Sequence, residues 1–228
     1  MERVLNFLSD LGANNDKIWF EANKNRYKEA KSIFEDFADE LIERVKSFDS
    51  SMNGLTLKDC TYRIYRDVRF SPDKRPYKTH MGVFISKGGK KSGRSGYYFH
   101  IEPKGQAYLG GHLICCGAYC PEPAVLKSIR EEFMLSGDEL LESIKIAQNK
   151  GFEVEWENCL QRIPKGFPAD SPFSDYFRLK NMLVSQPVND RFILGKNLAK
   201  RVADKFESCL DFNTRLNRAI DYAYEEMM

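Results

Sequence analysis

Apolar residues recur at helical spacing along the first fifty positions. Val4, Phe7, Leu8 and Leu11 predict a helix over residues 3–11. Capping oxygens at residues 14–16 predict a second start before Trp19 and Phe20, and a longer apolar stripe predicts a helix over residues 27–48. We interpret this part of the chain as helices that pack through their apolar faces.

A period of two replaces the helical spacing from about residue 60. Over residues 62–70 apolar and polar side chains alternate, which predicts a strand. Glycine-rich or Pro-Lys-Gly connections of hairpin type separate three further predicted strands, over residues 81–86, 97–102 and 106–115. Short links between consecutive strands favour an antiparallel meander over parallel βαβ units.

Helical spacing returns after the Pro121-Glu122-Pro123 sequence. The pattern predicts helices over residues 126–133, 140–147, 189–210 and 214–227, and strands over residues 152–156 and 182–188. Residues 164–172 are predicted to form a loop rich in proline and glycine. The prediction is one α+β domain over residues 1–228, an antiparallel sheet flanked by N-terminal and C-terminal helices. The alternative is a separate C-terminal helical lobe from about residue 121.

Composition excludes several classes of protein. The 228 residues include 35 basic and 33 acidic side chains, for a formal charge of +2, and 42% are hydrophobic. These values exclude a disordered tail, a collagenous repeat and a wholly basic nucleic-acid coat. No stretch approaches the roughly 18 apolar residues of a membrane span, and the first residues lack the apolar run of a signal peptide. We therefore expect a cytoplasmic protein without a membrane partner.

The small net charge conceals a strongly basic segment. Residues 58–94 hold eleven basic and three acidic side chains, a local charge of +8, and the rest of the chain carries −6. Such polarisation draws anions toward the basic segment. The alternative interpretation is a set of solvated lysines and structural Arg–Asp pairs.

The basic segment contains the predicted ligand-binding residues. Arg66 falls within an apolar row of the predicted strand, where a guanidinium requires a partner or a ligand. Pro72 and Pro76 stiffen the loop that follows, so its basic groups are presented with little ordering cost. The predicted ligand-binding set is Arg63, Arg66, Arg69, Lys74, Arg75, Lys78, Thr79 and Tyr98.

A polar face is predicted beside the basic loop. In the predicted strand 97–102, Tyr98, His100 and Glu102 share one side. If residues 103–105 form a three-residue loop, the hairpin register predicts four cross-strand pairs. They are Glu102 with Gln106, His100 with Tyr108, Tyr98 with Gly110, and Gly96 with His112. Gly110 and Gly111 would leave open space above Tyr98.

Three residues of this region are candidates for acid–base chemistry. They are His80, at the end of the basic loop, and His100 with Glu102 two residues further on. A histidine oriented by a carboxylate can act as a general acid or base. The alternative is a solvent-facing side of the sheet with ordinary cross-strand pairs.

The cysteines are predicted to be reduced and buried, because the chain has no export signal. A zinc site at His112, Cys115 or Cys116, and Cys120 is the alternative, but no C-x2-C pair supports it. The sequence therefore assigns no metal ligand, and it identifies no cofactor.

Several of these segments together resemble a known family. They are Asn14-Asn15-Asp16-Lys17 with Trp19-Phe20, the run over residues 62–71 continued by residues 74–80, residues 96–103, and Pro121-Glu122-Pro123. The chain resembles the bacterial and fungal domain of unknown function 2461 (DUF2461) family over nearly its whole length. The resemblance implies a single domain but supplies no activity, cofactor or catalytic residue.

Three functions are compatible with these features. The first is binding of a phosphate-bearing or other anionic small ligand, with acid–base chemistry at the histidines and Glu102. The second is nucleic-acid binding through residues 58–94, with tyrosines available to stack on bases. The third is a non-catalytic interaction module. The sequence identifies neither a substrate nor a reaction nor an oligomeric state.

Overall fold

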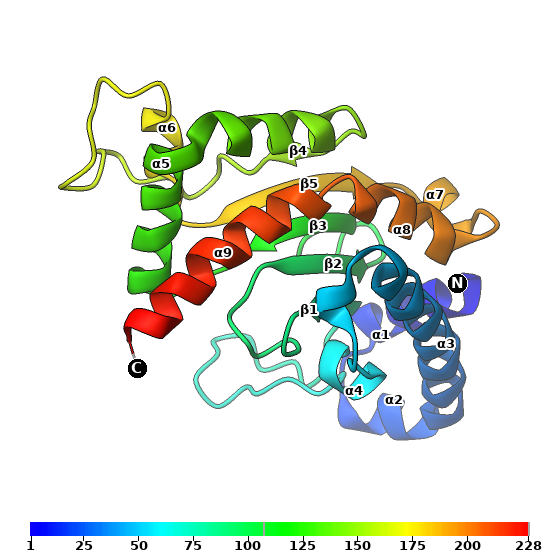
Figure 1. Ribbon diagram of the computed structural model, residues 1–228. Helices are drawn as coiled ribbons and strands as arrows, with labels where there is room; N and C mark the ends of the chain where they lie inside the picture. Colours follow the sequence, from blue (N-terminus) through cyan, green and yellow to red (C-terminus); the bar gives the residue numbers. More distant parts are fainter. Residues whose placement is uncertain (107, 228) are drawn as a thin grey trace. The chain divides into compact units, whose positions relative to one another are not determined.

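A computed structural model describes residues 1–106 and 108–227, with the elements labelled in Figure 1. The helices are α1 (Glu2–Ala13), α2 (Lys17–Ala22), α3 (Lys24–Phe48), the 3-10 helix η1 (Ser50–Met52), α4 (Leu57–Cys60), α5 (Pro123–Gln148), α6 (Ser174–Phe177), α7 (Asp190–Leu194), α8 (Leu198–Glu207) and α9 (Leu210–Glu226). The strands are β1 (Met81–Ser86), β2 (Gly96–Ile101), β3 (His112–Ala118), β4 (Glu153–Val154) and β5 (Met182–Val188).

The strands form an antiparallel sheet in the order β1-β2-β3-β5-β4. The first three are consecutive neighbours, as expected of a meander, and β5 then lies between β3 and β4. The predicted α+β class, with a sheet flanked by helices, is confirmed. Within the described residues, no helix combines the length and the apolar character that a membrane crossing requires.

The described chain divides into two compact units. The first comprises Met1–Ile85, Tyr98–Ile114 and Pro187–Ala203, and the second comprises Ser86–Tyr97, Cys115–Gln186 and Asp204–Met228. A lobe boundary near residue 121 stays a prediction. The candidate site lies within the first unit.

In the first unit the apolar faces of the N-terminal helices are buried as predicted. The four apolar residues that predicted the first helix are all buried in α1, which packs against α3. On α3, Phe37 contacts Phe99 of β2 with ring centroids 4.8 Å apart. The Asp16 carboxylate caps α2 by accepting the Trp19 N–H at 2.9 Å. Helix packing on β2 therefore holds the strand that carries the candidate site.

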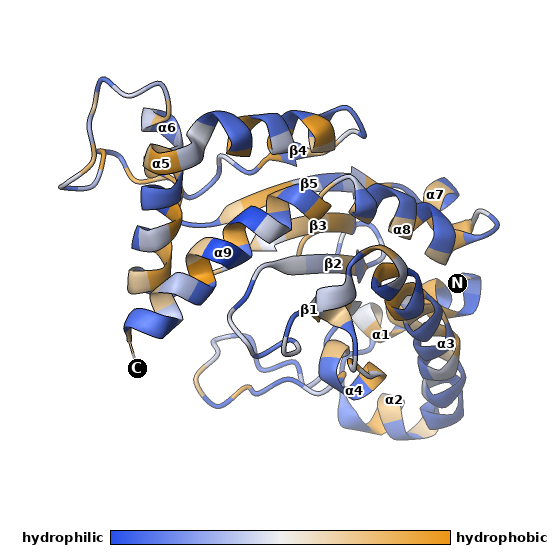
Figure 2. Ribbon diagram, viewed as in Figure 1, coloured by the Kyte–Doolittle hydropathy of each residue, from blue (hydrophilic) through white to orange (hydrophobic). Residues whose placement is uncertain are grey.

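In the second unit α5 packs against α9, and Tyr97 of β2 contacts Phe206 of α8 with ring centroids 5.3 Å apart. Figure 2 shows hydrophobic and hydrophilic positions side by side along α9, the pattern of a helix with one buried face. The two helices predicted over residues 126–147 are one element, α5, interrupted by the non-helical residue Ser136.

The strand predicted over residues 62–70 is wrong. In the described structure this segment makes isolated bridges, Thr61 with Val83 and Tyr65 with Tyr77, and it is otherwise a loop. Pro72 and Pro76 lack the N–H that a regular ladder needs, and the chain folds back within a few residues. The predicted apolar row is not buried as a row either, because Phe70 is 94% exposed.

The fourth predicted strand begins later than expected, at His112, and Ala107 lies outside the described residues. The cross-strand pairs predicted for Glu102, His100 and Tyr98 are therefore wrong, because their partners precede the strand. The pair of Gly96 with His112 is also wrong, because His112 accepts the Glu102 N–H just beyond the other end of β2. The reason is local: backbone N–H groups after residue 107 bond to the Glu102 carboxylate instead of to a neighbouring strand.

Other boundaries differ less. The helix predicted over residues 189–210 is divided into α7 and α8, with Gly195 at the end of α7. The strand predicted over residues 152–156 is reduced to Glu153–Val154. The strands predicted over residues 81–86 and 182–188 are confirmed.

Candidate functional site

The loop over residues 61–80 leads into β1 and is tied to the N-terminal helices through Tyr77. The Asn15 side chain bridges the Tyr77 backbone, accepting its N–H at 3.1 Å and donating to its carbonyl oxygen at 2.9 Å. The Tyr77 ring stacks on Phe20 with centroids 3.9 Å apart. These contacts fix the backbone immediately before Lys78, Thr79 and His80.

Most of the predicted basic ligands in this loop have partners inside the protein. Asp73 accepts hydrogen bonds from Arg66 at 2.7 Å and from Arg75 at 2.8 Å. The hydrogen bonds from Arg75 and Arg66 hold the pKa of Asp73 well below its usual value. Arg69 pairs in the same way with Asp67, and the Lys74 ammonium donates to backbone carbonyls. These cations stabilise the shape of the loop.

Lys78 and Arg63 differ from the others. Among the residues that the structure describes, neither makes a salt bridge with a carboxylate. The Lys78 ammonium lies 5.3 Å from the centre of the Tyr62 ring, in a cation–π contact. Burial, and then the charge of Arg63, lowers the pKa of Lys78. The acid near Arg63 is the exposed Asp67 carboxylate, which Arg69 already holds, so Lys78 and Arg63 still form a local excess of positive charge.

Glu102 is fully buried immediately after β2 and is held by backbone donors. Its Oε2 accepts the N–H groups of Leu109 at 2.7 Å and Gly110 at 2.9 Å, and its Oε1 accepts that of Tyr108 at 3.1 Å. Burial alone would raise the pKa of Glu102, but hydrogen bonds from His100 and these backbone groups outweigh it and lower the pKa to about 2. The side chain is a carboxylate at neutral pH.

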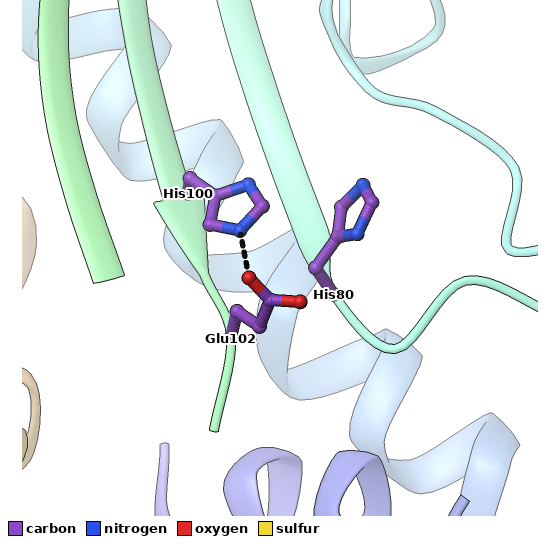
Figure 3. Close-up of side chains that lie close together, drawn as sticks. All are labelled: His80, His100 and Glu102. Atoms are coloured by element: carbon purple, nitrogen blue, oxygen red, sulfur yellow. Dashed lines mark hydrogen bonds and ion pairs between the residues drawn. The ribbon is translucent and has the colours of Figure 1, made fainter. Parts of the chain in front are cut away.

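His100 is also fully buried and lies between two polar partners. Its Nε2 faces Glu102 Oε2 at 3.4 Å, and its Nδ1 is 2.9 Å from the Tyr98 hydroxyl. Figure 3 shows the Glu102 carboxylate beside the His100 ring, with the His80 ring on its other side. Strand alternation accounts for the order Tyr98, His100, Glu102 on one side of β2.

His80 lies beside His100 and Glu102, and the three residues are called the His80 group below. Its ring stacks on Tyr108 with centroids 4.3 Å apart and lies 4.6 Å from the His100 ring. Burial, and then the neighbouring His100, lowers the pKa of His80 to about 3, so the ring is neutral at physiological pH. Its Nδ1 is buried and has no hydrogen-bond partner among the described residues. An unsatisfied buried polar atom costs about 1–3 kcal/mol, which a ligand at this nitrogen would offset.

His112 holds the backbone of Glu102 through its side chain. Its Nδ1 accepts the Glu102 backbone N–H at 3.1 Å, and its Nε2 lies 2.8 Å from Asp190 Oδ1. With both ring nitrogens occupied, His112 positions the backbone of Glu102 and has no nitrogen left for a ligand.

A small hollow of about 30 Å³, open to solvent, adjoins His80 and is called the pocket below. Tyr62 forms part of its wall, and burial raises the pKa of this phenol to about 12. Its lining residues are Tyr27, Lys31, Phe34, Glu35, Thr61, Tyr62, Ile64, His80 and Met81. Because Lys78 lies over the Tyr62 ring, its positive charge is next to this pocket.

The structure brings the predicted polar residues together, but not through the predicted pairing of two strands. Tyr98, His100, Glu102, Tyr108 and His112 contact one another, although Tyr108 arrives from a loop and not from a strand. The expectation of a solvent-facing sheet side is wrong for His100 and Glu102, which are fully buried. Thr79, predicted as a ligand residue, lies 3.4 Å from Glu102 Oε1.

Sequence reasoning missed the residues that support the His80 group. Asn15 and Asp190 come from distant segments, and no spacing rule connects them to His80 or His112. Gly82 was also missed: a Cβ there would lie 2.9 Å from the Tyr98 hydroxyl, so glycine permits this close approach. The open space predicted above Tyr98 was assigned to Gly110 and Gly111 instead. The glycine at the second position of the predicted strand 81–86 was the feature of the sequence that could have indicated this close approach.

The cysteines do not form the alternative zinc site proposed from the sequence. Cys115 and Cys116 are buried, and burial raises the pKa of both thiols well above its ordinary value. Cys120 is exposed, and His112 already uses both ring nitrogens. In the described residues the three side chains with converging metal-ligand atoms are His80, His100 and Glu102.

Comparison with known proteins gives one match. A family described as conserved hypothetical protein (DUF2461) matches residues 3–214. The chain belongs to the DUF2461 family. Neither the curated proteins nor the solved structures contain a significant match. The family assignment carries no activity, so function must be argued from the residues of the site.

Proposed function

We propose that this DUF2461 protein binds a phosphate-bearing or other anionic small ligand at Lys78 and Arg63, beside the pocket at His80. The observation that supports it is that neither residue makes a salt bridge with a carboxylate of the described chain. The acid near Arg63, Asp67, is held by Arg69. A partly buried ammonium beside a guanidinium is repelled by it, and an anion bound between them would remove the repulsion.

The pocket favours a small ligand. Its aromatic wall at Tyr62 and Tyr27 and the hydroxyl of Thr61 suit a ligand with an anionic group and a compact body. The other predicted ligand residues, including Arg66 and Arg75, act in this proposal by holding the loop, since Asp73 occupies both guanidinium groups. Acid–base chemistry at His80, His100 and Glu102 stays a prediction.

The test uses a pair of lysine variants with the same change in charge. Isothermal titration calorimetry measures binding of inorganic phosphate, a nucleoside monophosphate and a sugar phosphate. Lys78→Met is expected to weaken binding at least about tenfold, the loss of one charge-assisted hydrogen bond. Lys74→Met, which removes a lysine that caps backbone carbonyls, is the control and is expected to change affinity less than about threefold. Equal losses in the two variants, or no binding of any anion by the unmodified protein, would contradict the proposal.

A specific observation favours nucleic-acid binding as the second candidate. Phe70 is 94% exposed at the outer end of the basic loop, with the Arg69 guanidinium 5.9 Å from its ring centre. An exposed aromatic ring among cations can stack on an unpaired base. This candidate predicts binding to mixed oligonucleotides that weakens steeply with added salt and with Phe70→Ala. Binding that is absent, or insensitive to salt, would eliminate it and leave the loop as an interaction module.

A further inference from the structure

We infer that His80, His100 and Glu102 bind a divalent transition-metal ion. Each offers one ligand atom, and these atoms lie within 4.8 Å of one another. The three side chains come from two segments, His80 from the residue before β1 and the other two from the end of β2. Figure 3 shows the carboxylate with an imidazole on either side.

The contact between His100 and Glu102 is loose for a hydrogen bond. Its length of 3.4 Å exceeds the usual 2.7–3.2 Å of an N–H···O bond. Two ligands about 2.1 Å from a tetrahedral ion are separated by roughly 3.4 Å. The His100 ring and the Glu102 carboxylate are therefore near the spacing of two ligands of one ion. Such an ion would take Oε1, because Oε2 already accepts two backbone N–H groups, and His80 has to approach by side-chain rotation.

His80 supplies the second, independent observation. Its Nδ1 is buried and has no partner in the part of the chain that the structure describes, although the ring packs closely between Tyr108 and His100. Imidazole nitrogens are the commonest metal donors in proteins. An ion bound there would satisfy the one buried polar side-chain atom of these three residues that the described protein leaves without a bond.

The surrounding hydrogen bonds are those expected around metal ligands. The Tyr98 hydroxyl holds the Nδ1 of His100, which leaves Nε2 for an ion. Leu109 and Gly110 hold Glu102 Oε2, whereas Oε1 has one backbone bond and a long contact of 3.4 Å to Thr79. Oε1 is therefore the less tightly held oxygen, where an ion would displace the long contact to Thr79, and the carboxylate is fixed in orientation before an ion arrives.

The donor set selects the class of ion. Two imidazoles and one carboxylate suit zinc, iron(II), manganese, cobalt or nickel, whereas magnesium and calcium prefer oxygen ligands alone. Three protein ligands leave at least one coordination position for water or for another ligand. The inference stands without the anion proposal, because binding of the ion alone can be measured.

The experiment uses full-length protein treated with chelator and then titrated with zinc chloride in a calorimeter. One ion per chain is expected to bind, and His80→Asn and Glu102→Gln are expected to lose at least about tenfold in affinity. The control is Cys120→Ser combined with Cys159→Ser, which removes the two cysteines that are not buried and could bind zinc adventitiously. This control is expected to keep the affinity.

A second measurement does not depend on variants that fold. Nuclear magnetic resonance of ¹⁵N-histidine-labelled protein is expected to show zinc-dependent shifts of the His80 and His100 rings at saturation of a single site. The inference is overturned if zinc produces no heat and no shift of these rings, or if the double cysteine variant abolishes binding.

Discussion

Replacement of Glu102 by glutamine tests the physical role of the buried carboxylate. The side chain is fully buried and accepts three backbone N–H groups, from Tyr108, Leu109 and Gly110. The amide keeps one acceptor oxygen and introduces an NH₂ group that faces donors. At least one backbone N–H therefore loses its partner, and the remaining bonds lose their charge assistance.

The expected cost follows from these losses. A hydrogen bond to a charged group contributes about 1.5–3 kcal/mol, and an unsatisfied buried donor costs about 1–3 kcal/mol. We expect the free energy of unfolding to fall by about 3 kcal/mol, which corresponds to a decrease of roughly 6–12 °C in Tm for a chain of this size.

The assay is urea unfolding at pH 7 on chelator-treated protein, with amide hydrogen exchange at Tyr108, Leu109 and Gly110. Exchange at these amides should accelerate in Glu102→Gln. The control, Glu157→Gln, changes an exposed carboxylate and should shift the free energy of unfolding by less than about 0.5 kcal/mol. A loss below about 1 kcal/mol with unchanged exchange would refute the assigned role.

Three further changes test other contacts. Asn15→Ala removes both side-chain bonds to the Tyr77 backbone, and thermal unfolding should show a loss of about 1–3 kcal/mol; an unchanged Tm would contradict this anchor. Gly82→Ala places a Cβ 2.9 Å from the Tyr98 hydroxyl, and urea unfolding should show that the free energy of unfolding falls by about 1–3 kcal/mol. An unchanged free energy would mean that the Tyr98 ring moves aside without cost. Burial raises the pKa of Asp221, but hydrogen bonds from Lys87 and Arg94 outweigh it, so the pKa is lowered in the folded state. The stability that Asp221 contributes is therefore present above pH 3.8 and is lost as the pH falls through the folded pKa. Asp221→Asn should remove this component when the free energy of unfolding is measured against pH. Identical pH profiles for the variant and the wild type would argue against the assignment.

The regular elements could be predicted because each buries one face. Helical spacing of Val4, Phe7, Leu8 and Leu11 corresponds to a buried stripe on α1, and alternation in β2 places Tyr97, Phe99 and Ile101 in the core. These patterns result from burial against a neighbouring element, which local sequence reports directly.

The loop over residues 61–80 could not be predicted in this way. Its alternation has a period of two, but Asp73 recruits Arg66 from seven residues away and Arg75 from two, and this turns the chain back on itself. Side-chain bonds of this kind compete with strand pairing and leave no periodic signal.

The candidate site was predictable in composition but not in geometry. Histidines and a carboxylate near a basic loop indicated His80, His100 and Glu102, but the backbone donors around Glu102 belong to residues whose side chains give no indication of the role. The unpartnered nitrogen of His80 is a property of packing, which only a three-dimensional structure shows.

The group of His80, His100 and Glu102 is tested most directly by crystals of the protein grown with zinc and measured on both sides of the zinc absorption edge. An anomalous peak is expected within bonding distance, about 2.0–2.2 Å, of a ring nitrogen of each histidine and an oxygen of Glu102. Zinc-grown crystals without a peak there, with His100 Nε2 still facing Glu102 Oε2 at 3.4 Å, would contradict a metal site and leave the three residues as a structural group.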